Sequence, residues 1–412
     1  MQSFIFIIKI IKIKNIPIRQ EKNDIEQINN NEINNQLIEI NDIKSEFNSH
    51  PLIGLQLIGD YPYYINSVLQ CFCQSEKFIN YFKYNRSLLE VINKYNNKNQ
   101  PCLSKAFKSL IENLWPSKIK FIKQDYCHKN NFNKYYAPYE IIETITTISP
   151  IFDGKNQAEA KNFINFLIIK LNEELNKNQN RKNLFNNNLM PNQSNKNEML
   201  NFFVNNIMKE NISFISDNFY GTNQTQIECS LCKIKKYNYE INTILIFPLD
   251  EIIKHKLLFN ANNQNNNIIT LKDCLEFNQK IHILSGENAI PCDNCKLICT
   301  SNYQTLIYTF PEILIIILEK NKNSKIQFEI EEKLRLKNYI LESQTGYKFK
   351  LFGIVSKFVD GCSNEHYFAF CKSPIDNYWY RYNNDFVSKV NNFEKEIKDS
   401  ICPFILFYQK LK

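Results

Sequence analysis

The sequence predicts an α+β protein, and three observations lead to this class. Apolar residues show helical spacing in the first half of a region that begins near Pro51, and short runs of β-branched and aromatic residues fill its second half. Two CxxC pairs lie among the strand-like runs. Helices and strands that are separated along the chain are typical of α+β proteins. We expect one folded region over residues 51–410.

The first predicted helix lies within 54–72, GLQLIGDYPYYINSVLQCF, which reads as a short loop that leads into an amphipathic helix. Asn66 and Ser67 are candidate N-caps, because their side chains can accept hydrogen bonds from the first turn. The apolar residues near helical spacing are Val68, Leu69, Phe72, Phe78, Ile79 and Phe82.

A second helix is predicted over 157–175, with Glu173 and Glu174 exposed to solvent. The Asn-rich tract 176–198 predicts a surface loop after it. The apolar face of this helix consists of Phe163, Phe166, Leu167 and Leu171.

Strands are predicted where short runs of β-branched and aromatic residues recur in the second half of the chain. One of them, 305–318, is apolar enough to be read as a single buried strand, although it contains Pro311. The predicted strands cover 212–220, 238–248, 305–318, 347–356, 366–372, 378–382 and 402–409.

The composition is that of a globular protein with a sizeable core, because 43% of the 412 residues are hydrophobic. The formal charge of +8 is small for this length and the lysines are scattered, so we expect a solvated surface and no nucleic-acid partner. Thirteen cysteines without a convincing signal peptide indicate a reducing compartment, the cytoplasm and/or the nucleus.

Residues 1–50 are a candidate N-terminal leader, which we expect to be mostly disordered. The apolar run at its start is interrupted by Lys9, Lys12 and Lys14, so it is too short and too charged for stable membrane insertion. A stray strand and a weak amphipathic membrane contact are the alternatives for this run.

The four cysteines of the CxxC pairs, Cys229, Cys232, Cys292 and Cys295, are candidate metal ligands. Four thiolates around zinc (Zn2+) make a closed tetrahedral site, which is structural and not catalytic. Cys299 is a spare candidate ligand. The alternative is a group of thiols that bind no metal.

Residues 54–72 resemble the cysteine box of the ubiquitin-specific proteases, GLxNxGNTCYxNSxLQ. Further blocks of that family follow in order: QAEAKNFINFLIIKLNEEL, the segment SFISDNFYGTNQTQIECSLC that enters the zinc finger, YTFPEILIIILEKN, the histidine box GIVSKFVDGCSNEHYFAFCK, and WYRYNNDFV. The resemblance covers about 51–410. In the cysteine box the matching residues are Gly54, Leu55, Gly59, Tyr64, Asn66, Ser67, Leu69 and Gln70.

The resemblance implies a papain-like cysteine protease fold with three parts. A helical thumb would cover about 51–200, and a β-rich palm about 205–220 and 305–410. A zinc-ribbon fingers subdomain would cover about 221–304, with the Asn-rich stretch 260–267 as an insertion that changes the shape of its tip. In this family the fingers cradle ubiquitin.

The resemblance also marks a lost nucleophile. The catalytic cysteine of the family falls on Pro62 when counted forward from Gly59, and on Tyr63 when counted back from Asn66. A cysteine at a helix start has its thiol pKa lowered by the helix dipole, and neither residue here can act as a thiolate does. The oxyanion asparagine falls on Leu57, so a second part of the chemistry is missing.

Two other members of the catalytic group have counterparts. His366 matches the general base and Asn383 the residue that orients it, so both are expected as remnants. Cys71 and Cys73 lie about two turns into the helix and are expected to point into the core.

Two positions of the family's helix box, which hold the basic C-terminal tail of ubiquitin, map to Glu159 and Asn162. One is still acidic and the other neutral, so we expect weakened recognition of the tail. A solvated helix charge is the alternative for Glu159.

The leading functional hypothesis is a catalytically impaired or inactive family member that binds ubiquitin, a ubiquitin-like protein or a multiprotein complex. An active thiol-dependent deubiquitinase is the first alternative, because the extra residue within 60–63 could reflect a sequence error. A non-catalytic scaffold of the splicing type is the second. That branch normally carries an N-terminal Cys/His-rich zinc module, whereas residues 1–50 hold no cysteine and only His50.

Overall fold

The computed structural model describes most of the chain beyond the predicted leader, which lies outside the described residues. The architecture below is that of the compact unit formed by 52–114 and 125–412. The described ranges are 52–59, 61–85, 87–96, 100–116, 134–154, 159–178, 191–259, 267–321, 324–342, 347–359, 365–398 and 402–411.

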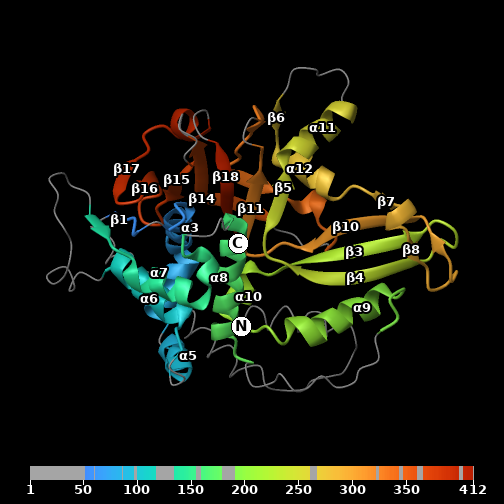
Figure 1. Ribbon diagram of the computed structural model, residues 1–412, viewed down its shortest axis with the longest axis horizontal. Helices are drawn as coiled ribbons and strands as arrows, with labels where there is room; N and C mark the ends of the chain where they lie inside the picture. Colours follow the sequence, from blue (N-terminus) through green and yellow to red (C-terminus); the bar gives the residue numbers. More distant parts are fainter. Residues whose placement is uncertain are drawn as a thin grey trace, which may run out of the picture. The chain divides into compact units, whose positions relative to one another are not determined.

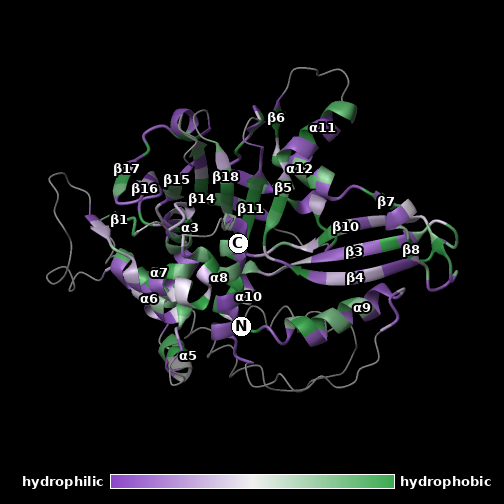
Figure 2. Ribbon diagram, in the orientation of Figure 1, coloured by the Kyte–Doolittle hydropathy of each residue, from purple (hydrophilic) through white to green (hydrophobic). Residues whose placement is uncertain are grey.

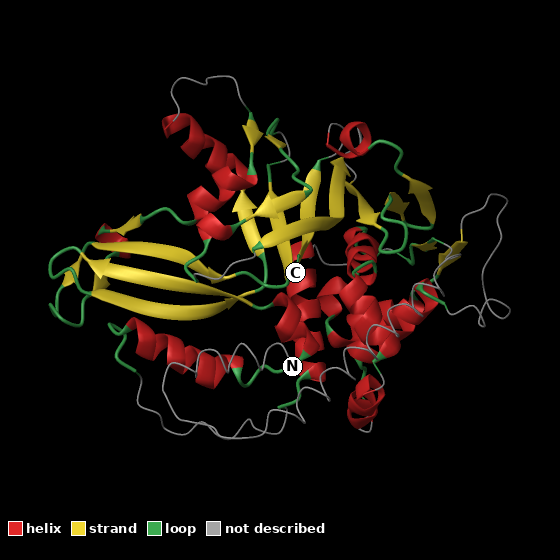
Figure 3. Cartoon of the chain, turned by 180° about the vertical axis from the view of Figure 1, so that it is seen from behind, coloured by secondary structure: helices red, strands yellow, loops and turns green. Residues whose placement is uncertain are grey.

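Two larger sheets organise the unit (Figures 1 and 3). The first has eight strands in the order β17-β16-β15-β14-β18-β11-β5, with β13 also paired to β14. Its pairs are antiparallel except for β11 with β5. The strands are β5 (Leu245–Pro248), β11 (Ile313–Glu319), β13 (Lys333–Arg335), β14 (Lys348–Val359), β15 (Glu365–Lys372), β16 (Trp379–Asn383), β17 (Phe386–Lys389) and β18 (Pro403–Lys410).

The second sheet has four antiparallel strands in the order β4-β3-β10-β7. Short two-stranded pairs accompany the two sheets: β1 with β2, β6 with β12, and β8 with β9. The bounds are β1 (Ile53–Leu55), β2 (Lys134–Tyr136), β3 (Gly221–Cys229), β4 (Lys235–Asn242), β6 (Ile268–Ile269), β7 (His282–Leu284), β8 (Ile290–Pro291), β9 (Ile298–Cys299), β10 (Ser301–Thr309) and β12 (Gln327–Phe328).

The helices of the first half lie beside the larger sheet, and α3 packs directly on β14 and β15 (Figure 1). Helix α9 instead packs along β4 of the smaller sheet. The α-helices are α3 (Tyr64–Cys73), α4 (Glu76–Ile79), α5 (Ser87–Asn96), α6 (Leu103–Leu114), α7 (Tyr139–Ile148), α8 (Ala160–Leu175), α9 (Lys196–Phe203), α10 (Phe214–Phe219), α11 (Leu249–Phe259) and α12 (Leu271–Asn278).

The main core lies where the helices meet the larger sheet. Aromatic rings from α3, α4, α6, α10 and β18 stack around Phe72 and Phe78, with centroids 5.3–6.3 Å apart. Six consecutive residues of β11, from Ile313 to Leu318, are buried, as expected for a central strand covered on both faces. Figure 2 shows hydrophobic residues along β11 and β5, whereas β3 and β4 are largely hydrophilic.

Several sequence predictions are confirmed. Helix α8 covers most of 157–175 and buries Phe163, Leu167 and Leu171, while Phe166 is half-buried. The apolar residues predicted for the first helix are all buried, although they are divided among α3, α4 and the π-turn that follows. The four C-terminal strand predictions correspond to β14, β15, β16 and β18.

The predicted strand 212–220 is wrong, because this stretch forms helix α10. Ser213 starts the helix with a capping box, in which its hydroxyl accepts from the Ser216 backbone N–H at 3.0 Å and the Ser216 hydroxyl accepts from the Ser213 N–H at 2.9 Å. Two satisfied backbone donors outweigh the β-propensity of the isoleucine and phenylalanine residues in this stretch.

The prediction of one strand over 305–318 is also wrong, because the chain leaves the smaller sheet after β10 and enters the larger one as β11. Pro311 lies at the break, where its missing N–H ends the ladder. Glu312 follows, with ion pairs to Lys77 at 3.0 Å and Lys410 at 3.2 Å. Burial raises the pKa of the Glu312 carboxyl, but the two ammonium groups outweigh this effect and hold the pKa below its usual range.

Two further stretches differ from their predictions. The stretch 238–248 is divided between β4 and β5, which belong to different sheets. The tract 176–198 is not a loop throughout, because α9 begins at Lys196. The side chain of Asn195 caps that helix by accepting from the N–H groups of Asn197 and Glu198. Residues 179–190 of the tract lie outside the described residues.

Glu174 is buried, which contradicts its predicted exposure. Its carboxylate accepts from the backbone N–H groups of Leu103 at 3.0 Å and Ser104 at 2.6 Å, at the start of α6. A carboxylate satisfies the free N–H groups of a helix start and interacts favourably with the helix dipole. Glu173 is exposed, as predicted.

The range predicted for the fingers, 221–304, is divided in the structure. Strand β5 joins the larger sheet, and α11 packs on β5 and β11. Residues 260–266 of the predicted tip insertion lie outside the described residues, but the flanking α11 and β6 belong to this part and not to the smaller sheet. The smaller sheet is therefore formed by β3 and β4, within 221–242, and by β7 and β10, which follow residue 281.

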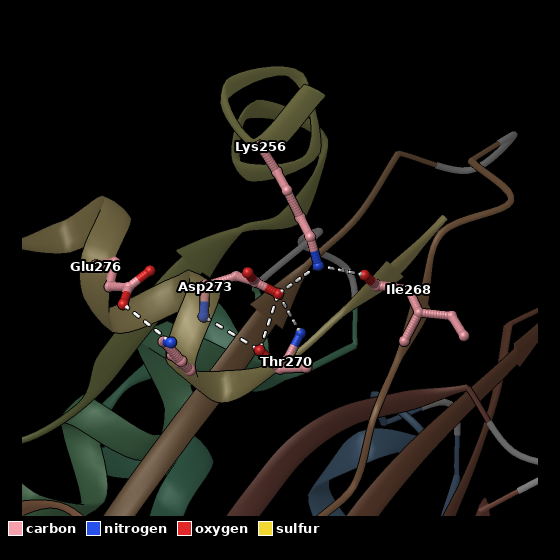
Figure 4. Close-up of polar contacts among 6 residues, drawn as sticks. Lys256, Ile268, Thr270, Asp273 and Glu276 are labelled. Atoms are coloured by element: carbon pink, nitrogen blue, oxygen red, sulfur yellow. Dashed lines mark hydrogen bonds and ion pairs between the residues drawn. The ribbon is translucent and has the colours of Figure 1, made fainter. Parts of the chain in front are cut away.

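A polar network joins α11, β6 and α12 in this region (Figure 4). Thr270 caps α12 in a capping box with Asp273, and the ammonium group of Lys256 donates to the Asp273 carboxylate at 2.8 Å and to the Ile268 carbonyl at 3.0 Å. An ion pair between Lys272 and Glu276 lies on the outside of α12. These bonds hold the two helices and β6 together.

No helix within the described residues combines the length and the hydropathy that crossing a bilayer requires.

Candidate functional site

The start of helix α3 faces strand β15 through two aromatic rings. Tyr63 is the N-cap residue of α3, and the carbonyl of Pro62 accepts from the Ile65 N–H at 3.0 Å. The ring centroids of Tyr63 and His366 are 6.2 Å apart. The Tyr63 side chain is 49% exposed, so it lies at the surface beside His366. The structure thus brings together Tyr63 and His366, two predicted site residues that are distant along the chain.

His366 and Asn383 come from neighbouring elements of the larger sheet. His366 is the second residue of β15 and pairs with Phe358 of β14. Asn383 is the last residue of β16 and pairs with Phe386 across a turn. The first turn residue, Asn384, has φ of +52°, a conformation that asparagine tolerates better than most residues.

This turn is tied to α3 and β1 by hydrogen bonds. The side-chain amide of Asn66 donates to the Asn384 side chain at 3.1 Å and to the Leu55 carbonyl at 3.2 Å. The Leu55 N–H donates to the Asn384 carbonyl at 2.8 Å. Asn66 is therefore not the helix cap that the sequence suggested; it holds the β16–β17 turn against the helix. Ser67 also lies inside α3 and does not cap it.

Gly54 permits the close approach of β1 to the same turn. A Cβ at this position would lie 2.6 Å from the carbonyl oxygens of Asn384 and Asp385. These are backbone atoms, so any side chain would force the turn away. Leu57 follows β1, is half-buried and has no side-chain donor.

The four predicted metal ligands form a compact cluster at the end of the smaller sheet. The sulfur atoms of Cys229, Cys232, Cys292 and Cys295 all lie within 4.8 Å of one another. Two sulfurs bound to one tetrahedral zinc, each about 2.3 Å from the metal, lie about 3.8 Å apart. The Cys232–Cys292 distance of 3.7 Å and the Cys229–Cys295 distance of 3.9 Å agree with that value.

The two CxxC turns have the same backbone geometry. In the first, the N–H of Lys233 donates to the Cys229 carbonyl and the N–H of Cys229 to the Ile234 carbonyl. The second repeats both bonds from Lys296 to Cys292 and from Cys292 to Leu297. Lys233 and Lys296 each adopt the left-handed conformation, with φ of +61° and +57°. The sequence analysis did not predict the left-handed backbone conformation of these two lysines.

Backbone N–H groups also point at the sulfurs of the first turn. The N–H of Cys232 lowers the pKa of the Cys229 thiol, and the N–H of Ile234 lowers that of Cys232. Donors aimed at a sulfur favour the thiolate, which is the form that binds metal. The spacing of the four sulfurs therefore fits a structural zinc ion.

Comparison with known proteins decides the family. A family model described as "Ubiquitin carboxyl-terminal hydrolase" matches residues 53–408. The chain belongs to this family. The match spans both sheets and the helices of the first half, so it agrees with the papain-like, zinc-ribbon architecture expected from the sequence.

Curated relatives are distant in sequence. "Ubiquitin carboxyl-terminal hydrolase 2" of Bos taurus is 23% identical over 369 residues, which cover 87% of this chain and 55% of the bovine protein. The protein of the same name in Gallus gallus is 25% identical over 318 residues, covering 74% of this chain and 80% of its own length. The chain thus spans about half the length of the bovine relative.

Solved structures support the fold. A SAGA DUB module bound to monoubiquitin matches with a TM-score of 0.56 and 19% identity, covering 88% of this chain and 69% of that chain. The Ubp8–Sgf11–Sgf73–Sus1 SAGA DUB module matches with a TM-score of 0.53 and 18% identity, covering 88% and 68%.

The cysteines of helix α3 point into the core of this family member. The Cys71 sulfur lies 3.7 Å from that of Cys371 on β15, and both residues are fully buried. Burial raises the pKa of the Cys73 and Cys371 thiols well above the usual value. Cys71 therefore packs against the larger sheet, and both cysteines of α3 lie in the core as expected.

The predicted tail-binding residues lie at the start of α8. Glu159 is the N-cap residue, and Asn162 is exposed in the first turn. The Glu159 carboxylate is not free: the Lys161 ammonium group lies 2.9 Å from it and 3.0 Å from the Glu319 carboxylate at the end of β11. Lys161 thus occupies the position between two acids, a feature that the sequence analysis missed because Glu319 is distant along the chain.

Proposed function

We propose that this chain is a ubiquitin-binding member of the ubiquitin carboxyl-terminal hydrolase family that does not hydrolyse its ligand. The observation that carries the proposal is the ring of Tyr63 at the start of α3, opposite His366. In the family the nucleophilic thiol occupies this place, according to the alignment of residues 54–72.

The chemistry of the replacement supports inactivity. The hydroxyl of a tyrosine does not replace the cysteine thiolate, which is the nucleophile that this chemistry uses. Leu57, aligned with the oxyanion asparagine, cannot donate a hydrogen bond to a tetrahedral intermediate. Loss of the nucleophile and of one oxyanion donor each costs orders of magnitude in rate, and members of such a group fail as a unit.

His366 and Asn383 are the remnant base and its orienter under this proposal. They lie on β15 and β16, which are neighbouring strands of the larger sheet, and this supports assigning them these two roles. Without a cysteine at the reacting position, His366 has no thiol proton to accept there. We also propose the thumb, palm and fingers with the boundaries given above, and we assign 245–278 to the palm because β5 joins the larger sheet.

Ubiquitin binding is supported by the parts that remain. The solved neighbour with monoubiquitin shares this fold, and a carboxylate persists at Glu159, where the family holds the basic tail. The ribbon would hold Zn2+ through Cys229, Cys232, Cys292 and Cys295. The ion would supply a structural cross-link between the two turns and no chemistry.

We further propose that the protein acts in the cytoplasm or nucleus and within a multiprotein complex. Reduced thiols require such a compartment, and the SAGA DUB modules are complexes of several chains. These neighbours share only the fold, so the identity of the complex does not follow from them.

Calorimetry with ubiquitin tests the proposal, together with a fluorogenic ubiquitin C-terminal amide. We expect a complex and no cleavage. Glu159→Arg should weaken the complex, whereas Glu173→Arg at the exposed far end of the same helix should not. Cleavage that a thiol reagent abolishes would contradict inactivity. Absence of heat at high concentration would contradict ubiquitin binding and leave the scaffold role.

A further inference from the structure

A fifth cysteine lies against the proposed zinc ligands. The Cys299 sulfur is 3.3 Å from the Cys229 sulfur. This distance is shorter than the 3.7 Å between the sulfurs of Cys232 and Cys292 and the 3.9 Å between those of Cys229 and Cys295. Cys229, Cys292 and Cys299 form one buried group, with Cys232 and Cys295 partly buried beside it. Five thiols therefore share a site that needs four.

The short distance indicates that Cys299 is not a ligand of the same ion as Cys229. Two sulfurs on one tetrahedral zinc are held about 3.8 Å apart by the metal. A sulfur 3.3 Å from Cys229 fits a thiol that donates its S–H to a ligand thiolate. Cys299 thus lies next to the tetrahedron, in contact with one of its corners.

The backbone already holds the two cysteines side by side. Cys229 ends β3 and pairs with Ser301, the first residue of β10, while Cys299 ends β9 two residues earlier. The Ser230 N–H donates to the Thr300 carbonyl at 3.0 Å, between the two cysteines. A disulfide needs its sulfurs about 2.05 Å apart, so the two sulfur atoms must approach by little more than 1 Å (3.3 Å now).

We propose that Cys299 and Cys229 are an oxidation site, at which a peroxide joins them in a disulfide and thereby releases the zinc ion. The inference rests on the zinc ribbon of the proposed function. The Cys229 thiolate attacks a peroxide oxygen, giving a sulfenic acid and hydroxide, which solvent neutralises. The Cys299 thiol then attacks that sulfur, the S–S bond forms, and the thiol proton leaves with the hydroxyl group as water.

Loss of the Cys229 thiolate leaves three ligands, which hold zinc much less tightly than four. A reductant such as a dithiol would reverse the reaction, because the disulfide returns two thiols. Cys229 and Cys299 are only 4% and 8% exposed, but they lie just below the surface, because Cys232 and Cys295 of the same cluster are partly exposed and the neighbouring Leu231 and Ile298 are 61% and 73% exposed.

The test measures zinc release from the full chain with a chromogenic zinc chelator during hydrogen peroxide treatment. Metal analysis first establishes about one zinc per chain, so that failure of the ribbon is seen separately from failure of the switch. Cys299→Ser should retain zinc and slow its release by at least about tenfold, because the resolving thiol is gone. Cys402→Ser, which removes an exposed thiol elsewhere, should leave the rate unchanged.

Peptide mapping of the oxidised wild-type protein identifies the disulfide directly and does not depend on whether a variant folds. We expect a Cys229–Cys299 disulfide whose amount follows the zinc released and which disappears after reduction. Equal release rates in the wild type and Cys299→Ser would overturn the proposal. So would a disulfide that joins Cys229 to Cys232, Cys292 or Cys295 in place of Cys299.

Discussion

Glu174 offers the sharpest test of the packing of the helical part. Its buried carboxylate accepts from the N–H groups of Leu103 and Ser104 at the start of α6. Glu174→Ala removes both acceptors in a place that water does not reach. Each buried N–H left without an acceptor costs about 1–3 kcal/mol, so we expect a loss of about 2–6 kcal/mol in the free energy of unfolding.

Glu173→Ala is the matched control, because Glu173 is the adjacent residue on α8 and is 59% exposed with an ion pair to Lys170. Exposed pairs of this kind contribute about 0–1 kcal/mol. Glu174→Gln should lose less than the alanine variant, since its amide keeps one oxygen that can accept from Leu103 or Ser104.

Urea unfolding, followed by circular dichroism and by tryptophan fluorescence, gives the measurement. Trp115 and Trp379 are both buried, so their combined emission reports on loss of the packed interior. The denaturant slopes should agree among the variants, which shows that the same surface unfolds. If the alanine variants at 173 and 174 lost equal stability, the carboxylate would not be the buried cap described here.

Four other changes have defined outcomes. Tyr63→Cys should give a thiol that a ubiquitin electrophile labels, while turnover stays about 10²–10³-fold below that of the double variant with Leu57→Asn, because one oxyanion donor is worth that much. Lys161→Gln frees two carboxylates and should tighten ubiquitin binding in calorimetry by a few-fold, roughly 0.2–1 kcal/mol, with less gain at high salt. Glu312→Gln should lower stability at pH 7, and its difference from the wild type should shrink as the pH falls below the ordinary glutamate pKa and through the lower pKa of Glu312 in the folded protein, because a depressed carboxyl pKa contributes stability only while the carboxyl is ionised. Cys292→Ser should lower both metal content, measured by elemental analysis, and thermal stability, whereas an equally stable, metal-free wild type would contradict the ribbon.

The sequence was informative where one periodicity or spacing determined the structure. The apolar face of α8, the strands β14 and β15 and the two CxxC turns are examples. In each, the pattern lies within a stretch of fewer than about twenty residues. Burial of the apolar residues, or the spacing that metal ligands need, then favours one local structure over the others.

Sequence-based prediction failed where contacts between residues distant along the chain determined the local structure. Glu174 appears on the polar side of its helix, yet α6 covers it and uses its charge. The stretch that forms α10 has strand-forming residues, but the Ser213 capping box fixes it as a helix. Lys161 meets Glu319 only after the sheet has formed, so neither the pattern around Glu159 nor its charge revealed the ion pair.

The central claim is that the start of α3 presents the Tyr63 ring where the family presents a thiol. Intact-mass analysis of the chain after incubation with ubiquitin bearing a C-terminal thiol-reactive group tests this most directly. The account predicts that the mass stays that of the free chain while non-covalent ubiquitin binding persists. A covalent ubiquitin adduct on any cysteine of the unmodified sequence would contradict it.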